Sequence, residues 1–387
     1  MSENQQRMWA TIIMFACFFI GSQTGVCRAD GDARFVETVD DASDAVQQKN
    51  VSFFDRLVFA PVPMVNPTLG AGLTGVVMYM HPEDDFWNDP GNEANEELHS
   101  MTGVAAMATS NESWAAGMFH KGFYANDRFR GTAYLAYGEF NLKYYGVGND
   151  SALRNNPLKY SADVTAFQGT FSARIFDHWY LGPKIKVFNW DFGVDFSSLH
   201  PVLPTLHHSV KTVGLGLAGE RDTTNDSVFA TAGGKLQFDF MSYNEAWGGD
   251  YDYSKASTSY AHYYGLTDRL VVSGMAELNF SDGNTPFFDM PFLRLRGFPY
   301  AEYIDKQSAS IQTEIKYKLT QRWGVNLFGG LGWVADEPNQ LFKNSTIPTG
   351  GFGVRYLLSE KETMYLSTEI GFGPNSQAVY FRVGEWF

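Results

Sequence analysis

The sequence has little cysteine, and after its first thirty residues it has no long apolar run. Its two cysteines, Cys17 and Cys27, both lie near the N-terminus of a 387-residue chain. The rest of the chain therefore has no disulfide framework and no thiol chemistry. A membrane-spanning helix needs about 20 consecutive apolar residues, and no later segment has them. The net charge of −14 argues against nucleic acid as a partner.

The N-terminus has the pattern of a secretory signal peptide. Arg7 precedes an apolar run from Met8 to Ile20, and small residues follow as far as Ala29. This pattern predicts a signal peptide over residues 1–29 that is cleaved after Ala29. The alternative of a lipoprotein acylated at Cys27 is disfavoured by the residues that precede it. Residues 30–52 are polar and acidic, and we expect them to form a short periplasmic lead.

Aromatic residues and glycine are abundant, and from about residue 53 the chain alternates between apolar and polar residues. It holds 32 Phe, 20 Tyr, 9 Trp and 38 Gly. In one stretch Ile311 and Ile315 alternate with Gln312 and Glu314. Side chains of a strand alternate between its faces, so one face suits lipid and the other a water-filled lumen. Residues 53–387 are therefore predicted to be all-β, forming a transmembrane antiparallel up-and-down β-barrel.

The alternation predicts fifteen strands, and a sixteenth is expected because bacterial single-chain barrels have an even number. The first, near 54–65, contains Pro61 and Pro63, which would confine it to an edge or seam. The polar segments His81 to Ser100 and Asn141 to Leu158 are predicted loops. The first of these is acidic, but it lacks the ligand spacing of a calcium loop. The other fifteen strands are expected near 69–80, 101–110, 113–123, 128–140, 160–175, 178–190, 209–219, 227–240, 253–264, 268–280, 305–319, 322–334, 349–358, 362–372 and 377–386.

The chain ends on an amphipathic strand. Alternation places Val379, Phe381, Val383 and Phe387 on one face, and Tyr380, Arg382, Gly384 and Trp386 on the other. The first face suits lipid, and Glu385 interrupts it one step before the end. Taken alone, this segment also fits the C-terminal strand of a soluble sandwich.

Several motifs follow one another in a characteristic order along the chain. They are Leu295-Arg296-Gly297-Phe298 with Tyr303 and Asp305, Phe328-Gly329-Gly330-Leu331-Gly332, Gly351-Phe352-Gly353-Val354-Arg355-Tyr356, the C-terminal residues from Tyr380, Tyr144-Tyr145-Gly146-Val147-Gly148-Asn149-Asp150 and, less faithfully, Asp222-Thr223-Thr224. On these motifs, the segment from about Phe287 to Phe387 resembles the bacterial surface antigen (D15) domain of the Omp85 superfamily, the BamA and TamA type of barrel. It looks closest to the short members without POTRA domains.

The resemblance implies an extracellular loop that folds back into the lumen and carries Arg296, Gly297 and Phe298. Arg296 is then expected to meet Glu314 and Phe328 on the next two strands. A guanidinium held out of bulk water needs a bidentate carboxylate or a ring to stack on. Gly330 stands where the larger members carry an aspartate, so one anchor is predicted to be lost, while Gly330 and Gly332 make room for the loop.

The resemblance further implies an unstable seam between the first and last strands. It also implies that the assembly machinery reads the C-terminal signal, which comprises Phe381, Val383 and Phe387. The expected location is the outer membrane of a Gram-negative bacterium. Besides that machinery, the expected partners are outer-membrane lipid and a protein or lipid cargo.

The function predicted from the sequence is insertion or translocation of protein or lipid at the outer membrane, without enzymatic activity. The alternative is a passive channel or structural surface barrel, because fold does not fix function. A hydrolase using His207-His208 or His262 is disfavoured, because such histidines in barrels are usually solvated. No catalytic residue, metal or cofactor is expected, since there is no zinc spacing, phosphate loop or nucleophile elbow.

Overall fold

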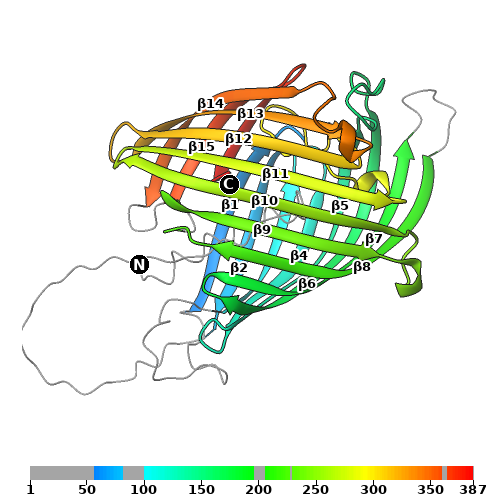
Figure 1. Cartoon of the computed structure of the whole chain (residues 1–387), viewed down its shortest axis with the longest axis horizontal. Coiled ribbons are helices and arrows are strands. Elements are labelled where there is room, and N and C mark those ends of the chain that lie inside the picture. Colours follow the sequence, from blue (N-terminus) through cyan, green and yellow to red (C-terminus); the bar gives the residue numbers. More distant parts are fainter. Residues whose placement is uncertain (1–55, 82–99, 196–204, 227–228, 360–363, 387) are drawn as a thin grey trace, which may run out of the picture.

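The structure, a computed structural model, describes residues 56–81, 100–195, 205–226, 229–359 and 364–386. The predicted signal peptide, the polar lead and the acidic loop after His81 lie outside these residues. Within them, sixteen antiparallel strands form a closed barrel (Figure 1). The predicted fold class and strand number are confirmed. No helix in the described ranges is long and apolar enough to cross a membrane.

Each strand pairs with its neighbours in the sequence, and the barrel closes between the first and the last. The strands are β1 (Leu57–Asn66), β2 (Gly70–Met80), β3 (Met101–Thr109), β4 (Trp114–Tyr124), β5 (Phe129–Tyr144), β6 (Leu158–Phe176), β7 (Trp179–Asp195), β8 (Thr205–Asp222), β9 (Ala232–Tyr243), β10 (Tyr253–Thr267), β11 (Leu270–Gly283), β12 (Gln307–Lys318), β13 (Trp323–Ala335), β14 (Ile347–Ser359), β15 (Met364–Phe372) and β16 (Gln377–Val383). In the described part of the chain, three short 3₁₀ helices lie in loops, η4 (Glu245–Trp247), η5 (Phe287–Asp289) and η6 (Pro338–Gln340).

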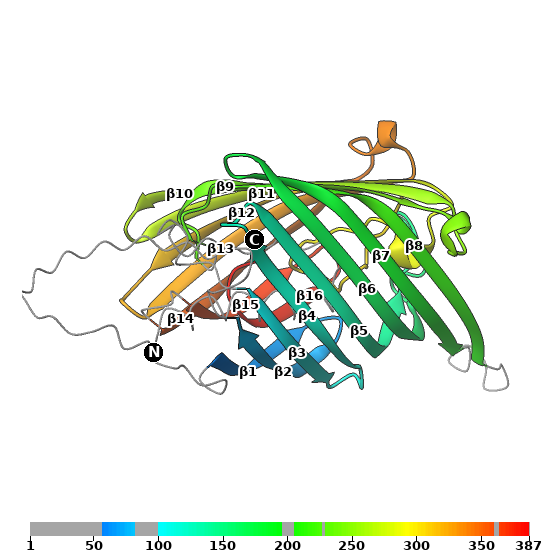
Figure 2. The same ribbon diagram turned by 90° about the horizontal axis from the view of Figure 1, so that it is seen from below.

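The strands differ in length, and β6 to β8 are the longest (Figure 2). The predicted loop over 141–158 is too long, because β5 continues to Tyr144 and pairs there with Leu158. Its residues still alternate, so the ladder persists beyond the last strongly apolar position.

The alternation of faces is as predicted. On β12, Ile311 and Ile315 are exposed, whereas Gln312, Glu314 and Lys316 are buried inside the barrel. A large apolar side chain left exposed on strand after strand suits contact with lipid.

The inner face is less uniformly polar than expected. On the first strands it is apolar, and clusters there include Val62, Val76, Met78, Met101 and Phe119. Most of the buried charged side chains belong to the part of the chain from about β7 onward. The lumen is therefore divided into an apolar side and a charged side.

Candidate functional site

The loop between β11 and β12 enters the barrel as a hairpin, and Figure 2 shows it in yellow inside the ring of strands. The Leu293 N–H donates to the Tyr303 carbonyl at 3.0 Å, and the Asp305 N–H donates to the Pro291 carbonyl at 3.0 Å. Phe292 and Ile304 form an antiparallel bridge. These bonds satisfy backbone groups that strands would otherwise pair, so the tip from residue 294 to 302 has a defined position.

The motif that follows β5 fastens this hairpin. Val147 forms a parallel bridge with Ile304, and the Gly148 N–H donates to the Ile304 carbonyl at 2.9 Å. The Arg154 guanidinium donates to the Glu302 carbonyl at 2.5 Å and stacks on the Tyr303 ring, with its carbon 3.8 Å from the ring centre. Burial raises the pKa of the Glu302 carboxyl to about 7, and the Arg154 charge opposes that rise. Two motifs far apart in the sequence thus meet in one contact.

Arg296 lies at the centre of the site and is 1% exposed. Its guanidinium donates to Glu314 at 3.0 Å, and its carbon lies 3.6 Å from the centre of the Phe328 ring. The sequence predicted both of these contacts. Glu314 comes from β12 and Phe328 from β13, and the two residues are directly paired across the strands. A buried guanidinium therefore has both a carboxylate and a ring face, which together replace its water.

The prediction that one anchor is lost is wrong. Glu369 on β15 is fully buried and accepts a second hydrogen bond from Arg296, at 3.2 Å. Asn326 joins the two carboxylates, because its amide nitrogen donates to Glu314 and to Glu369 at 2.8 Å each. Arg382 on β16 donates to Glu369 at 2.7 Å. The carboxylate is thus supplied by a strand two positions further along than the one bearing Gly330. The alternation of Ser367 and Glu369 with Thr368 in the sequence was the available signal.

Gly297 lets the loop backbone touch the wall. Its φ of +130° is one that residues with a Cβ rarely adopt, and a Cβ there would lie 2.7 Å from the Phe372 carbonyl. Its N–H donates to the Tyr380 hydroxyl at 2.9 Å, and its carbonyl accepts from the Ser376 hydroxyl at 2.9 Å. Phe298 is buried and packs edge-on against Tyr303. Gly297 therefore ties the loop to β15 and β16.

The glycines of β13 make room for the loop, as predicted. A Cβ on Gly330 would lie 2.8 Å from the Leu295 side chain, and one on Gly332 would lie 2.7 Å from Leu293. By contrast, a Cβ on Gly329, which faces the other way, would meet nothing closer than 3.6 Å. Small residues are therefore required only on the inward face.

The last residues depart from the predicted closing strand. β16 ends at Val383, and Glu385 then bonds inside the barrel to Lys316 and Arg355. Trp386 donates to Gln312 at 3.1 Å, and the Arg296 guanidinium lies 5.1 Å from its ring. Glu385 was expected on the outward face, which is wrong. The buried cations of β12 and β14 attract it inward.

The three residues of the predicted assembly signal do not share one environment. Phe381 is half-buried and pairs with Val65 of β1. Val383 was expected to face lipid with Val379, but it is buried against the cluster that contains Val62 and Val76, although it still pairs with Leu366 of β15. Phe387 lies outside the described residues.

The barrel closes through a short seam. β1 pairs with β2 from Leu57 to Asn66, whereas its ladder with β16 has a single register pair, Val65 with Phe381. Pro61 and Pro63 lack the backbone N–H groups that other residues of β1 can donate. Because the ladder with β2 runs through both prolines, the missing N–H groups lie on the β16 side. A cavity of about 230 Å³ lies beside the seam, between β1, β16 and the loop.

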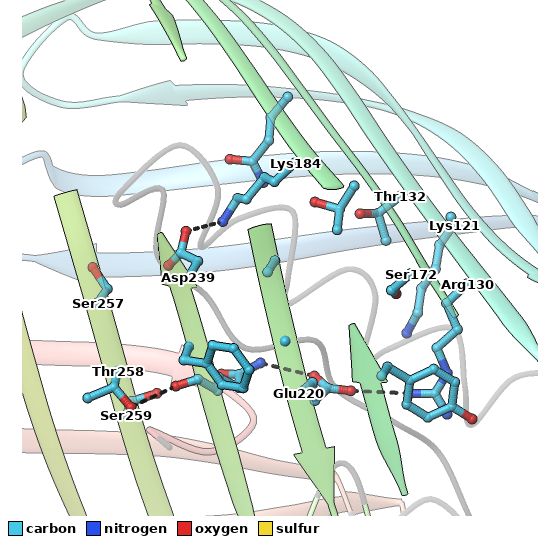
Figure 3. A pocket seen from close by; sticks show the side chains of 18 of the residues that line it. Lys121, Arg130, Thr132, Ser172, Lys184, Glu220, Asp239, Ser257, Thr258 and Ser259 are labelled. Atoms are coloured by element: carbon cyan, nitrogen blue, oxygen red, sulfur yellow. Dashed lines mark hydrogen bonds and ion pairs between the residues drawn. The ribbon is translucent and has the colours of Figure 1, made fainter. Parts of the chain in front are cut away.

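A second, polar cavity of about 130 Å³ lies against the charged wall (Figure 3). Lys184 pairs with Asp239 at 2.6 Å, and Arg130 pairs with Glu220 at 3.2 Å. The first pair joins β7 to β9 and the second joins β5 to β8, so each links strands that are not direct neighbours. Their charges are mutually satisfied, which suits a wall in contact with water.

No protein-family model and no curated protein sequence matches the chain. Solved structures do match it. The structure of BamA from Haemophilus ducreyi lacking POTRA domains 1–3 superposes with a TM-score of 0.60 at 12% identity, covering 90% of this chain and 75% of that one. At this identity the likeness is one of fold, a closed β-barrel. CdiB from Escherichia coli gives a TM-score of 0.55 at 13% identity, covering 84% of this chain and 62% of that one. CdiB from Acinetobacter baumannii gives 0.51 at 13% identity, with 85% and 60% covered.

Proposed function

We propose that this Omp85-like barrel lies in the outer membrane of a Gram-negative bacterium and inserts or translocates protein or lipid there, without enzymatic activity. The observation that carries the proposal is the short seam between β1 and β16. One register pair holds these strands, whereas β15 and β16 pair from Leu366–Val383 to Phe372–Gln377. A barrel that opens sideways needs one weak ladder among strong ones.

Two features of the sequence keep the seam weak. Pro61 and Pro63 have no backbone N–H, so β1 offers β16 two fewer hydrogen-bond donors. Glu385 turns inward to Arg355, so the chain after Val383 does not extend the ladder. An unpaired strand edge is a template for another strand. An incoming strand of a cargo protein could add by backbone hydrogen bonds to the edge of β16, which contains no proline. The barrel assembly machinery is the proposed partner during this protein's own biogenesis.

The proposal is tested by locking the seam. Val65 and Phe381 are directly paired and both face outward, so cysteines at these positions can form a disulfide. The only natural cysteines lie in the predicted signal peptide. The Val65→Cys/Phe381→Cys protein is placed in liposomes, oxidised, and assayed for the rate at which an added unfolded outer-membrane barrel folds. We expect oxidation to abolish the acceleration and reduction to restore it.

The matched control is Ile370→Cys/Val379→Cys, which places the same disulfide on the outer face between β15 and β16. That lock should leave the acceleration unchanged, since those strands are already fully paired. Equal activity of the oxidised and reduced seam variant would contradict the proposal. A steady small conductance in planar bilayers, unaffected by the seam lock, would instead identify the alternative, a passive channel.

A further inference from the structure

Lys186 occupies an unusual place on the inner wall. It lies on β7 and is 2% exposed. Its neighbour on β8 is Gly214, which in turn pairs with Tyr243 on β9. A Cβ on Gly214 would lie 2.5 Å from the Tyr243 ring. The glycine therefore leaves room for the tyrosine ring over β8, where Tyr243 and Lys186 line the same cavity.

The carboxylates near Lys186 are already engaged. Asp239 accepts from Lys184 at 2.6 Å. Asp289, which η5 of the inserted loop supplies, accepts from Lys255 at 2.6 Å and from the Tyr253 hydroxyl at 2.6 Å. Among the described residues, Lys186 itself has no hydrogen bond or ion pair. Lys184 and Lys255 thus engage the two aspartates, and Lys186 is left without a carboxylate partner.

This lysine lines a cavity of about 190 Å³ whose other walls are largely aromatic. Phe140, Tyr160 and Trp190 come from the wall, and Phe288 comes from the loop. The Trp190 and Phe288 rings have their centres 5.0 Å apart. An apolar cavity of about 150 Å³ can hold benzene, so this one accommodates a single ring or a short acyl chain.

A buried cation without a partner is costly, and an anion that reaches it offsets much of that cost. The aromatic walls favour an apolar body, and the lysine favours an acidic head. We propose that the cavity binds a small anionic amphiphile, with its carboxylate on the Lys186 ammonium and its apolar part among the rings of the strands and of η5. Because η5 belongs to the inserted loop, such a ligand also holds the loop against β5 to β7.

Benzoate and its neutral counterpart benzyl alcohol distinguish the contribution of the ligand's charge to binding from that of its apolar ring. Affinities are measured by saturation-transfer NMR on the folded full barrel in nanodiscs of zwitterionic lipid. We expect the parent to bind benzoate more tightly than benzyl alcohol. Lys186→Met should weaken benzoate about tenfold or more, in line with the loss of one hydrogen bond to a charged group. Its affinity for benzyl alcohol should stay within about twofold of the parent's, since the apolar contacts remain.

The matched control is Lys159→Met, which removes the same charge from an exposed position on the adjacent strand β6 and should change neither affinity. Ala166→Leu fills the cavity from its wall and should weaken both ligands. The proposal is overturned if the parent does not bind benzoate, or if Lys186→Met binds it as tightly as the parent. Should Lys186→Met fail to fold, undiminished benzoate binding by Ala166→Leu overturns it instead.

Discussion

Removing the Glu314 carboxylate tests whether the buried charges hold the loop in the lumen. In Glu314→Ala, the Arg296 guanidinium and the Asn326 amide each lose an acceptor, at 3.0 and 2.8 Å. Arg296 keeps Glu369, but the cluster keeps four cations, Arg296, Lys316, Arg355 and Arg382, for two remaining carboxylates, Glu369 and Glu385. Breaking one partner of a buried pair costs about 3–5 kcal/mol. With one anchor retained, the lower figure of about 3 kcal/mol applies.

This cost falls on the docked loop more than on the barrel, because the strand ladders do not depend on Glu314. Every 1.4 kcal/mol is tenfold, so the undocked population should rise roughly 100-fold. Trypsin measures that population, since cleavage tracks the open form when opening is fast. The loop carries Arg294, Arg296 and Lys306 as cleavage sites. Cleavage near residue 296 divides the chain into two fragments on a denaturing gel.

The matched control is Asp336→Ala, which removes a carboxylate that pairs with the same loop at its surface. Lys306 and Asp336 lie 2.8 Å apart and are 38% and 63% exposed. An exposed pair is worth at most about 1 kcal/mol, so cleavage of this variant should rise by less than about fivefold. Equal cleavage rates for Glu314→Ala and Asp336→Ala would refute the view that burial makes the inner pair strong.

Further outcomes are expected. Gly297→Ala should raise the same cleavage about 5- to 150-fold, because its Cβ meets the backbone of β15 in a conformation costing about 1–3 kcal/mol; Gly329→Ala, facing open space, should not, and equal rates would remove the requirement for glycine at position 297. Burial raises the Glu302 pKa from 4.5 to about 7, so the docked loop holds more protons than the free loop between those values. Docking should be strongest below pH 4.5 and weaken as the pH rises through 7; cleavage normalised to a free loop peptide checks this, and Glu302→Gln should lose the change near pH 7, whereas burial also raises the pKa of Asp305 and leaves a dependence at lower pH. Deleting Phe387, a ring worth at most about 2 kcal/mol, should lower the amount of folded protein in the outer membrane several-fold with little change in melting temperature; normal abundance with a much lower melting temperature would make it a structural residue. Cleavage after Ala29 should leave a mature chain that thiol reagents do not label, and a labelled band of that size would contradict it.

Alternation along the sequence determined most of the barrel. A period of two assigns each residue to a face, and runs of that period indicated fifteen of the sixteen strands. The even strand number of bacterial single-chain barrels indicated the remaining one, β1. The same rule placed Glu314 and Phe328 inward, and the motif around Arg296 indicated which loop would meet them. An error of extent arose at the end of β5, where Leu142 and Tyr144 continue the alternation with Asn141 and Lys143 inside a segment that was predicted to be a loop.

Only the tertiary structure decided which inward residues meet across the lumen. Glu369 is 73 positions from Arg296, and periodicity fixes its face but not its partner, which depends on barrel curvature and the depth of the inserted loop. The inward turn of Glu385 likewise follows from the cations of β12 and β14 and from a β1 edge that offers β16 few donors. Lys186 lacks a carboxylate partner because Asp239 pairs with Lys184 and Asp289 pairs with Lys255, and these pairings depend on the tertiary structure. Local pattern fixes the wall of a barrel, but its contents depend on charges brought together by closure.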